Sequence, residues 1–292
     1  MEFIEAKTIV TNATPNRNYM AFDYVMNIYR GCSHGCIYCY ARSNYYEKNG
    51  NFDIVRAKKN ALEIIRNDLR RKIETGIVLT SGMSDPYNPQ EKEYKLTRNA
   101  LELINAFSFG ICIFTKSNLV TRDTDILQDI KEHSPVNISF SITCYDDDTS
   151  KKIEPFAAAT SERFKAIEHF ANNGLISGVL LDPMLPYITD TKENVLEMVK
   201  KAKYHGAKYI YLATEVTMAD VQREYFLKEA EKLYPRISEK YKERFKNYYH
   251  CRSPHQRKLQ AIFAEECEKE RIVYDMRAIN QMISHGYKKQ KR

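Results

Sequence analysis

The stretch Arg30-Gly31-Cys32-Ser33-His34-Gly35-Cys36-Ile37-Tyr38-Cys39-Tyr40 places three cysteines at C-x3-C-x2-C spacing, with an aromatic residue just before the last cysteine. Three thiolates on one short, glycine-containing loop can wrap one face of a [4Fe-4S] cluster, whose four irons are usually all held by thiolates. A loop that offers only three ligands leaves one iron open to a substrate or cofactor. The spacing therefore favours a reactive iron–sulfur cluster over a simple electron carrier.

The same cysteines allow two other interpretations. A zinc site would combine Cys32, Cys36 and Cys39 with His34 or a distant ligand. Structural zinc sites usually come as paired C-x2-C or C-x2-C…H-x3-H units, and no second pair follows here. A disulfide would leave one of the three cysteines over. A non-catalytic zinc-binding protein stays open as an alternative of a different class.

Length and composition limit the kinds of protein that this chain can be. Its 292 residues can form one large α/β domain, or one such domain with a small appendage. No run of 18 or more apolar residues exists, so no transmembrane helix is expected. The N-terminus lacks the basic and apolar regions of a signal peptide. Seven cysteines, an odd number, in an unsecreted chain indicate a reducing cytoplasm.

Short apolar runs alternate with segments of helical periodicity along the first two thirds of the chain. This alternation predicts a parallel sheet in an α/β fold. We expect strands at 24–29, 77–80, 110–116, 136–142, 175–181 and 208–212, and helices at 56–75, 96–107, 123–133, 161–173 and 191–204. Parallel sheets place functional groups at the carboxyl ends of their strands. The cysteine loop, residues 81–89, Lys116, residues 141–144 and residues 182–187 all follow strand ends, so they are expected to converge.

Positive charge is concentrated in the C-terminal quarter. Residues 219–292 hold 18 Lys and Arg against 11 Asp and Glu, whereas residues 1–218 balance at 27 against 27. We therefore divide the chain into a core, 1–218, with an extended lead-in over 1–24, and a basic, mainly helical extension, 219–292, with helices at 218–234, 236–249 and 254–270. The extension fits a solvated helical face or a nucleic-acid-binding surface, since aromatic side chains stand among cations. Those side chains are Tyr248, Tyr249, His250, Arg252, His255, Arg257 and Lys258.

The C-x3-C-x-aromatic-C motif resembles the signature of the radical S-adenosylmethionine (radical SAM) enzymes. Six strand–helix units match their partial (β/α)6 barrel. Five segments, at 27–42, 84–91, 115–123, 139–143 and 152–155, further resemble the spore photoproduct lyase-like branch, which is related to DNA repair photolyases. The resemblance implies that SAM binds the open iron. One electron, from a donor such as flavodoxin or ferredoxin, then cleaves SAM to methionine and a 5′-deoxyadenosyl radical that abstracts hydrogen from an unidentified substrate.

The resemblance also implies roles for single residues. Cys32, Cys36 and Cys39 would hold the cluster, and Tyr38 would pack on the adenine of SAM. Three residues that follow strands two, three and four would bind the rest of SAM, namely Ser84, Lys116 and Ser141. Ser84 would lie near its amino end and Lys116 against its carboxylate.

One position departs from the branch. Spore photoproduct lyase carries a cysteine on the loop after strand two, which returns a hydrogen atom to the product radical, and Gly82 is the best match here. The departure argues against reversal of thymine dimers. Cys144, after strand four, is the other cysteine near the expected site, either as a hydrogen-atom donor or as a small apolar side chain. Repair or modification of a nucleic acid, as in spore photoproduct lyase, stays an alternative to chemistry on another substrate.

Overall fold

A seven-stranded sheet forms the centre of the molecule, in the order β10-β9-β8-β7-β6-β3-β2. The computed structural model describes residues 1–14, 20–47 and 51–291. Neighbouring strands from β10 to β3 are parallel, and β2 joins the edge antiparallel to β3. The end strands do not pair with each other within the described residues, so the barrel is open. The strands are β2 (Val10–Asn12), β3 (Tyr24–Met26), β6 (Ile77–Thr80), β7 (Gly110–Thr115), β8 (Val136–Ser141), β9 (Ile176–Leu181) and β10 (Tyr209–Leu212).

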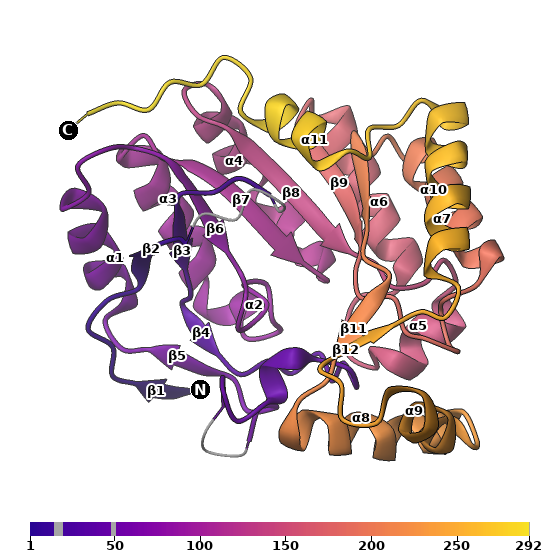
Figure 1. The fold of residues 1–292 in the computed structure, drawn as a ribbon. Helices are drawn as coiled ribbons and strands as arrows, with labels where there is room; N and C mark the ends of the chain where they lie inside the picture. The colour runs from indigo at the N-terminus through magenta and orange to yellow at the C-terminus, as the bar shows by residue number, and fades with distance from the viewer. Residues whose placement is uncertain (15–19, 48–50, 292) are drawn as a thin grey trace.

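Helices follow the parallel strands in turn and cover one face of the sheet (Figure 1). Each buries an apolar stripe against the sheet, as α3 does with Ala100, Leu101 and Ile104. The helices of this layer are α1 (Ala61–Arg70), α3 (Leu96–Ala106), α4 (Thr124–Lys131), α6 (Thr160–Asn172) and α7 (Lys192–Tyr204). Shorter segments lie in the connecting loops, namely α2 (Glu91–Tyr94), α5 (Asp147–Ile153) and the 3-10 turns η1 (Tyr40–Arg42) and η2 (Asn118–Asp123). The α/β fold predicted from the alternating pattern is confirmed.

A small second sheet supports the cysteine loop. Its order is β1-β5-β4, formed by β1 (Glu2–Ile4), β5 (Arg56–Lys58) and β4 (Tyr29–Arg30). The expected helix over 56–75 is therefore wrong at its start, because Arg56–Lys58 pairs with both other strands. The expected strand over 24–29 divides into β3 and β4, so the chain crosses from the main sheet to the small one just before the cysteines. Part of the lead-in, 15–19, lies outside the described residues.

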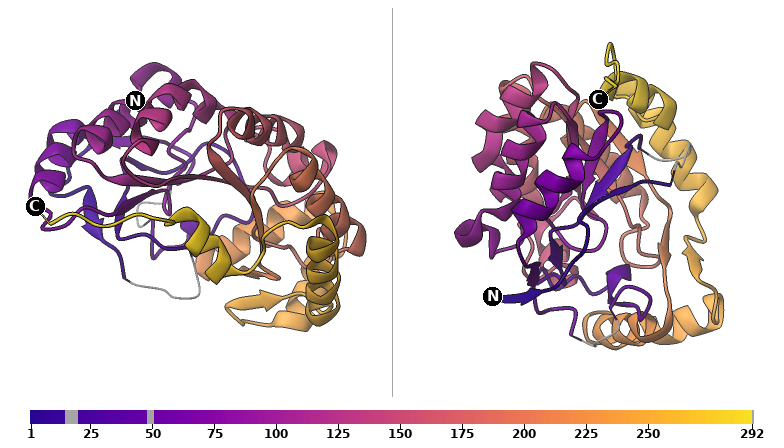
Figure 2. Two further views of the ribbon diagram at one scale, coloured as in Figure 1. Left: turned by 90° about the horizontal axis from the view of Figure 1, so that it is seen from above. Right: turned by 90° about the vertical axis from the view of Figure 1, so that its left-hand side faces the viewer.

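The C-terminal quarter packs onto the barrel core. Its helices are α8 (Asp220–Leu233), α9 (Ile237–Phe245), α10 (Gln256–Glu270) and α11 (Met276–Ile283), and β11 (Glu215–Thr217) pairs antiparallel with β12 (His250–Arg252). Leu259, Phe263 and Cys267 of α10 belong to the main apolar core. Figure 2 shows α11 and the yellow segment after it on the side of the sheet away from α3 and α4. Ile279 and Ile283 of α11 there contact a cluster that contains Tyr209 of β10.

Over the residues that the structure describes, every helix is too short or too polar to pass through a lipid bilayer.

Candidate active site

A cavity of about 590 Å³ opens at the carboxyl ends of β6, β7, β8 and β9, where the sequence predicts convergence. All seven residues expected to hold the cluster or SAM line it, which are Cys32, Cys36, Cys39, Tyr38, Ser84, Lys116 and Ser141. They come from the cysteine loop and from the ends of three different strands. The parallel sheet therefore brings side chains from four separate stretches of sequence around one space.

The cysteine loop is held by backbone contacts that its glycine makes possible. Gly31 has φ +76°, and a Cβ there would lie 2.3 Å from the carbonyl oxygen of Ile54 and 2.7 Å from that of Phe52. The amide of Cys32 donates to the carbonyl of Phe52 at 2.8 Å, and that of Ile37 donates to the carbonyl of Ile153 at 3.0 Å. Only glycine fits this close approach in a left-handed conformation.

The three thiols on this loop are free and face the cavity. Burial raises the pKa of the Cys32 thiol to about 12 and raises those of Cys36 and Cys39 as well. A buried thiol of this kind loses its proton when a metal centre supplies the compensating positive charge. Three soft sulfur donors around one cavity match the ligand set of an iron–sulfur cluster with one open iron.

The zinc alternative requires a tighter arrangement. Thiolates on one tetrahedral zinc ion, at a Zn–S distance of about 2.3 Å, lie about 3.8 Å apart. Among the residues that the structure describes, no group of three or more His, Cys, Asp or Glu side chains is arranged to hold a metal ion. In a cubane cluster each thiolate binds a different iron, which spreads the sulfurs farther apart. Three thiols on one loop suit a cluster with one open iron, and a single zinc ion stays the alternative.

The loop after β6 connects the cysteine loop to β7. The Ser84 hydroxyl donates to the carbonyl oxygen of Gly31 at 2.5 Å. The Asp85 carboxylate accepts from the Thr115 hydroxyl and from the Lys116 amide, both at 2.7 Å, and lies 3.5 Å from Nδ1 of His34. Asp85, which had no assigned role in the sequence, thus fixes the end of β7 and the backbone from which Lys116 projects.

A chain of alternating charges and polar groups lies behind the side chains expected to bind SAM. The Lys116 ammonium lies 5.7 Å from the ring centroid of Tyr38, whose hydroxyl donates to Glu154. Glu154 also accepts from the Thr143 hydroxyl at 3.0 Å and from Arg163 at 2.5 Å. The Arg163 guanidinium donates in turn to the carbonyl of Ser141 at 2.8 Å. Tyr38, Lys116 and Ser141 are thereby tied to one buried ion pair.

This network decides the charge of Lys116. Burial lowers the pKa of the ammonium, but the carboxylate of Glu154 and the thiols of Cys36 and Cys39 outweigh that effect and raise it. Lys116 therefore stays protonated and can meet a ligand carboxylate. Glu154 lies in the quoted segment 152–155, but its partner Arg163 is a helix residue nine positions later, and nothing in the sequence pairs them.

The structure places Cys144 away from the cavity. Its side chain is 3% exposed and packs in an apolar cluster with Ile153, and its thiol lies 3.5 Å from the carbonyl of Asp146. This packing agrees with its alternative role as a small apolar side chain, and hydrogen-atom donation by Cys144 stays an untested prediction. Gly82 does line the cavity, with φ +124° and its carbonyl accepting from the Tyr40 hydroxyl. Among the described residues around the cavity, the only thiols are those of the cysteine loop.

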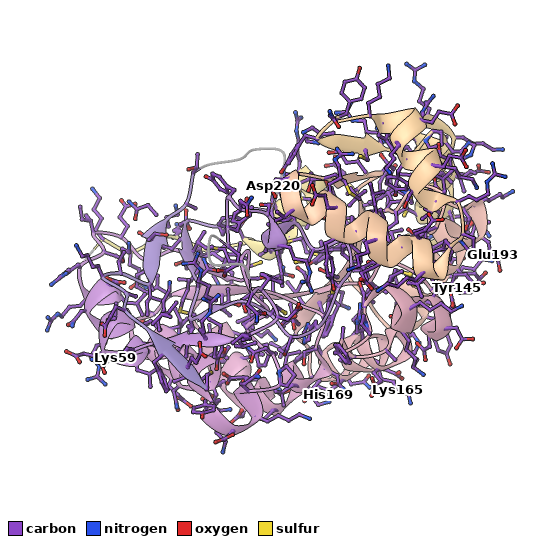
Figure 3. The ribbon with its side chains drawn as sticks, turned by 90° about the horizontal axis from the view of Figure 1, so that it is seen from below. Lys59, Tyr145, Lys165, His169, Glu193 and Asp220 are labelled. Carbon is purple, nitrogen blue, oxygen red and sulfur yellow. The ribbon has the colours of Figure 1, made fainter. Side chains whose placement is uncertain are left out.

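The extension supports the site from outside, which the charge pattern did not predict. Glu215, Val216 and Thr217 of β11, at the end of the core, line the cavity, and the extension begins just after them. The Gln222 side chain of α8 donates to the carbonyl of Tyr38 at 3.0 Å, and Asp220, labelled in Figure 3 where α8 begins, accepts from the amide of Asn44 at 3.2 Å. The helix therefore holds the outer side of the cysteine loop.

The predicted nucleic-acid-binding residues divide into three groups. Tyr248 and Tyr249 are 67% and 49% exposed, so their rings are accessible. His250 and Arg252 instead contact Glu215, at 2.7 and 2.8 Å, and support the cavity wall. His255, Arg257 and Lys258 lie at the start of α10.

Comparison with known proteins gives a consistent result. The family model for the radical SAM superfamily matches residues 26–198. The uncharacterised protein MJ0683 of Methanocaldococcus jannaschii is 32% identical over 193 residues, covering 65% of this chain and 71% of that protein. The uncharacterised protein Rv2578c of Mycobacterium tuberculosis H37Rv is 29% identical over 204 residues, covering 67% of this chain and 59% of that protein.

Solved structures agree on the fold. A spore photoproduct lyase mutant with bound AdoMet and dinucleoside spore photoproduct superposes with a TM-score of 0.68 at 16% identity, covering 87% of this chain and 76% of that one. The family model spans the cysteine loop and the strand ends that line the cavity. The chain belongs to the radical SAM superfamily.

Proposed function

We propose that this protein cleaves SAM reductively to a 5′-deoxyadenosyl radical, which abstracts hydrogen from a substrate bound in the same cavity. The observation that supports this most is the convergence of three thiols, a protonated lysine and an aromatic ring on one space of about 590 Å³. When bound, a [4Fe-4S] cluster would supply the open iron for SAM and the electron for its cleavage.

The chain's own residues would bind and orient SAM. Cys32, Cys36 and Cys39 hold the cluster, and Lys116 pairs with the methionine carboxylate. Tyr38 offers its ring to the adenine. The Ser84 hydroxyl already donates to Gly31, but its oxygen lone pairs are still available to accept from the amino group of SAM. Ser141 contributes a further polar contact from the end of β8.

Walls that exclude water would protect the radical. Phe52, Leu79, Phe114 and Leu180 surround the cavity with apolar surface, and Tyr40 closes over the Gly82 carbonyl. Such surroundings limit side reactions of a reactive intermediate. The reductant is proposed to be a small electron carrier such as flavodoxin or ferredoxin.

Anaerobic reconstitution with iron and sulfide, followed by dithionite and SAM, tests this function. We expect the absorption spectrum of a [4Fe-4S] cluster and production of 5′-deoxyadenosine. Cys36→Ala should abolish both, whereas Cys144→Ala, outside the cavity, should retain both. A reconstituted wild-type protein that binds zinc without iron and makes no 5′-deoxyadenosine would refute the proposal.

A second candidate is repair or modification of a nucleic acid. It is supported by the exposed rings of Tyr248 and Tyr249 and by the dinucleoside spore photoproduct bound in the similar structure. Deleting residues 219–292 would remove part of the core, so the double variant Tyr248→Ala/Tyr249→Ala is the better test. Salt-sensitive DNA or RNA binding that this variant weakens would support the candidate, and no binding by the wild type would exclude it.

A further inference from the structure

One part of the cavity wall, outside the cysteine loop, has no role in the function proposed above. It is formed after β9, on β10 and on β11, by Asp182, Pro183, Tyr211, Glu215, Val216 and Thr217. This wall carries two carboxylates and one phenol, whereas the SAM-facing wall carries thiols and an ammonium. The two walls therefore suit groups of different charge.

Asp182 is the unusual residue of this wall. Over the described part of the chain its carboxylate makes no hydrogen bond or ion pair, although Asp182 is largely buried. The charged groups that face it are Lys116, at the end of β7, and Glu215, on β11. Glu215 is already satisfied, since it accepts from His250 at 2.7 Å and from Arg252 at 2.8 Å. A partly buried carboxylate that lines a cavity without a hydrogen-bond donor from the protein can accept from a ligand that brings one.

Burial is the main reason that the pKa of Asp182 rises to about 6, with Glu215 raising it further and Lys116 opposing the rise. The carboxylate is consequently ionised at neutral pH and protonated near pH 5. The phenols of Tyr40 and Tyr211 face the same carboxylate, which contributes to raising the pKa of each. Both phenols stay neutral, so they add ring surface and polar tips without charge.

We infer that this wall is a substrate subsite, and that Asp182 accepts hydrogen bonds from an N–H-bearing group of neutral or positive charge. Amides, imides and amidines are such groups, and a flat one would lie against the rings of Tyr40 and Tyr211. Phosphate and carboxylate groups are excluded here, because Asp182 and Glu215 would repel them. This inference rests on the proposed function in one respect, namely that SAM occupies the opposite wall.

Hydrogen-bond donors to the Asp182 carboxylate could come from SAM as well as from the substrate, since SAM carries an amino group and ribose hydroxyls. Experiments must therefore distinguish SAM from the substrate as the source. Three small molecules of one shape serve as probes: benzamidine is cationic with N–H donors, benzamide is neutral with N–H donors, and benzoate is anionic without them. Their binding is measured by ligand-observed NMR on the full reconstituted chain with SAM present, so the readout does not depend on turnover.

We expect binding in the order benzamidine, then benzamide, with benzoate weakest. Asp182→Asn should weaken benzamidine about tenfold or more, as loss of a charge-assisted hydrogen bond does. Lowering the pH from about 7.5 to about 5 should weaken benzamidine in the wild type and have less effect in Asp182→Asn. The control variant Glu239→Gln, on exposed α9, should bind all three probes as the wild type does.

Three results would overturn the inference. These are benzoate binding as tightly as benzamidine, benzamidine binding unchanged in Asp182→Asn, and no binding of either N–H donor. A fourth result, loss of SAM affinity in Asp182→Asn with benzamidine binding intact, would assign the carboxylate to SAM instead. Circular dichroism and thermal unfolding establish that the variant folds. Failure of the proposed function is a separate result, since it is the absence of 5′-deoxyadenosine from the wild type.

Discussion

Replacing Arg163 by methionine tests whether the buried ion pair supports the site. The Arg163–Glu154 contact is 2.5 Å long, with side chains 0% and 1% exposed. Arg163→Met removes the ion-pair partner of the buried Glu154 carboxylate and the donors to the carbonyls of Ala158 and Ser141, at 2.7 and 2.8 Å. Removing one partner of a buried pair costs about 3–5 kcal/mol, so we expect a loss of that size in the free energy of unfolding.

Urea unfolding of the apoprotein measures this loss. Arg236→Gln is the matched control, because its ion pair with Glu239 is exposed at the surface and should contribute less than about 1 kcal/mol. The double variant Arg163→Met/Glu154→Gln should recover part of the stability, since it removes both charges of the pair and leaves Lys116 as the remaining buried charge. A loss below about 1 kcal/mol in Arg163→Met would refute the argument.

Three further outcomes are expected. Reconstituted Cys36→Ser should bind less iron and sulfide than the wild type by elemental analysis, while Cys144→Ser should match it. Gly31→Ala should destabilise the protein more than Gly82→Ala in urea unfolding, because a Cβ at Gly31 meets a carbonyl oxygen at 2.3 Å and one at Gly82 meets nothing nearer than 4.0 Å. Burial raises the folded-state pKa of Asp182 to about 6. The protonated carboxylate therefore favours the folded state below its unfolded pKa of about 3.9, and this contribution is lost as the pH rises through 6. The unfolding free energy of the wild type should fall by about 1–2 kcal/mol over that range, and the fall should be smaller in Asp182→Asn.

Local pattern predicts the main sheet well and the small sheet poorly. The apolar runs at 77–80 and 136–142 match β6 and β8 because both faces of a central parallel strand are buried. Arg56–Lys58 carries two charges and no apolar run, and it forms a strand only because Glu2–Ile4 and Tyr29–Arg30 lie beside it. Strands of this kind depend on distant pairing, which periodicity within one segment does not record.

The sequence likewise predicts some residues of the site and misses others. Cysteine spacing and strand ends predict that Cys32, Cys36, Cys39 and the side chains expected to bind SAM surround one cavity, since the topology alone places those loops together. Asp182 lies within a predicted strand-end loop. It differs from its neighbours because, among the described residues, its carboxylate has no hydrogen-bond or ion-pair partner, and only the structure shows this. Gln222 gave no signal at all, because its contact with Tyr38 spans 184 positions of sequence.

That contact also bears on how the protein matures in the cell. Residues near Tyr38 leave the ribosome early, while Gln222 and the rest of α8 are made 184 residues later. At about 5–20 residues per second, the interval is on the order of 10–40 s. During this time the cysteine loop has no helix against its outer side. The contact that supports the loop from outside therefore forms only after the strands of the main sheet have been synthesised.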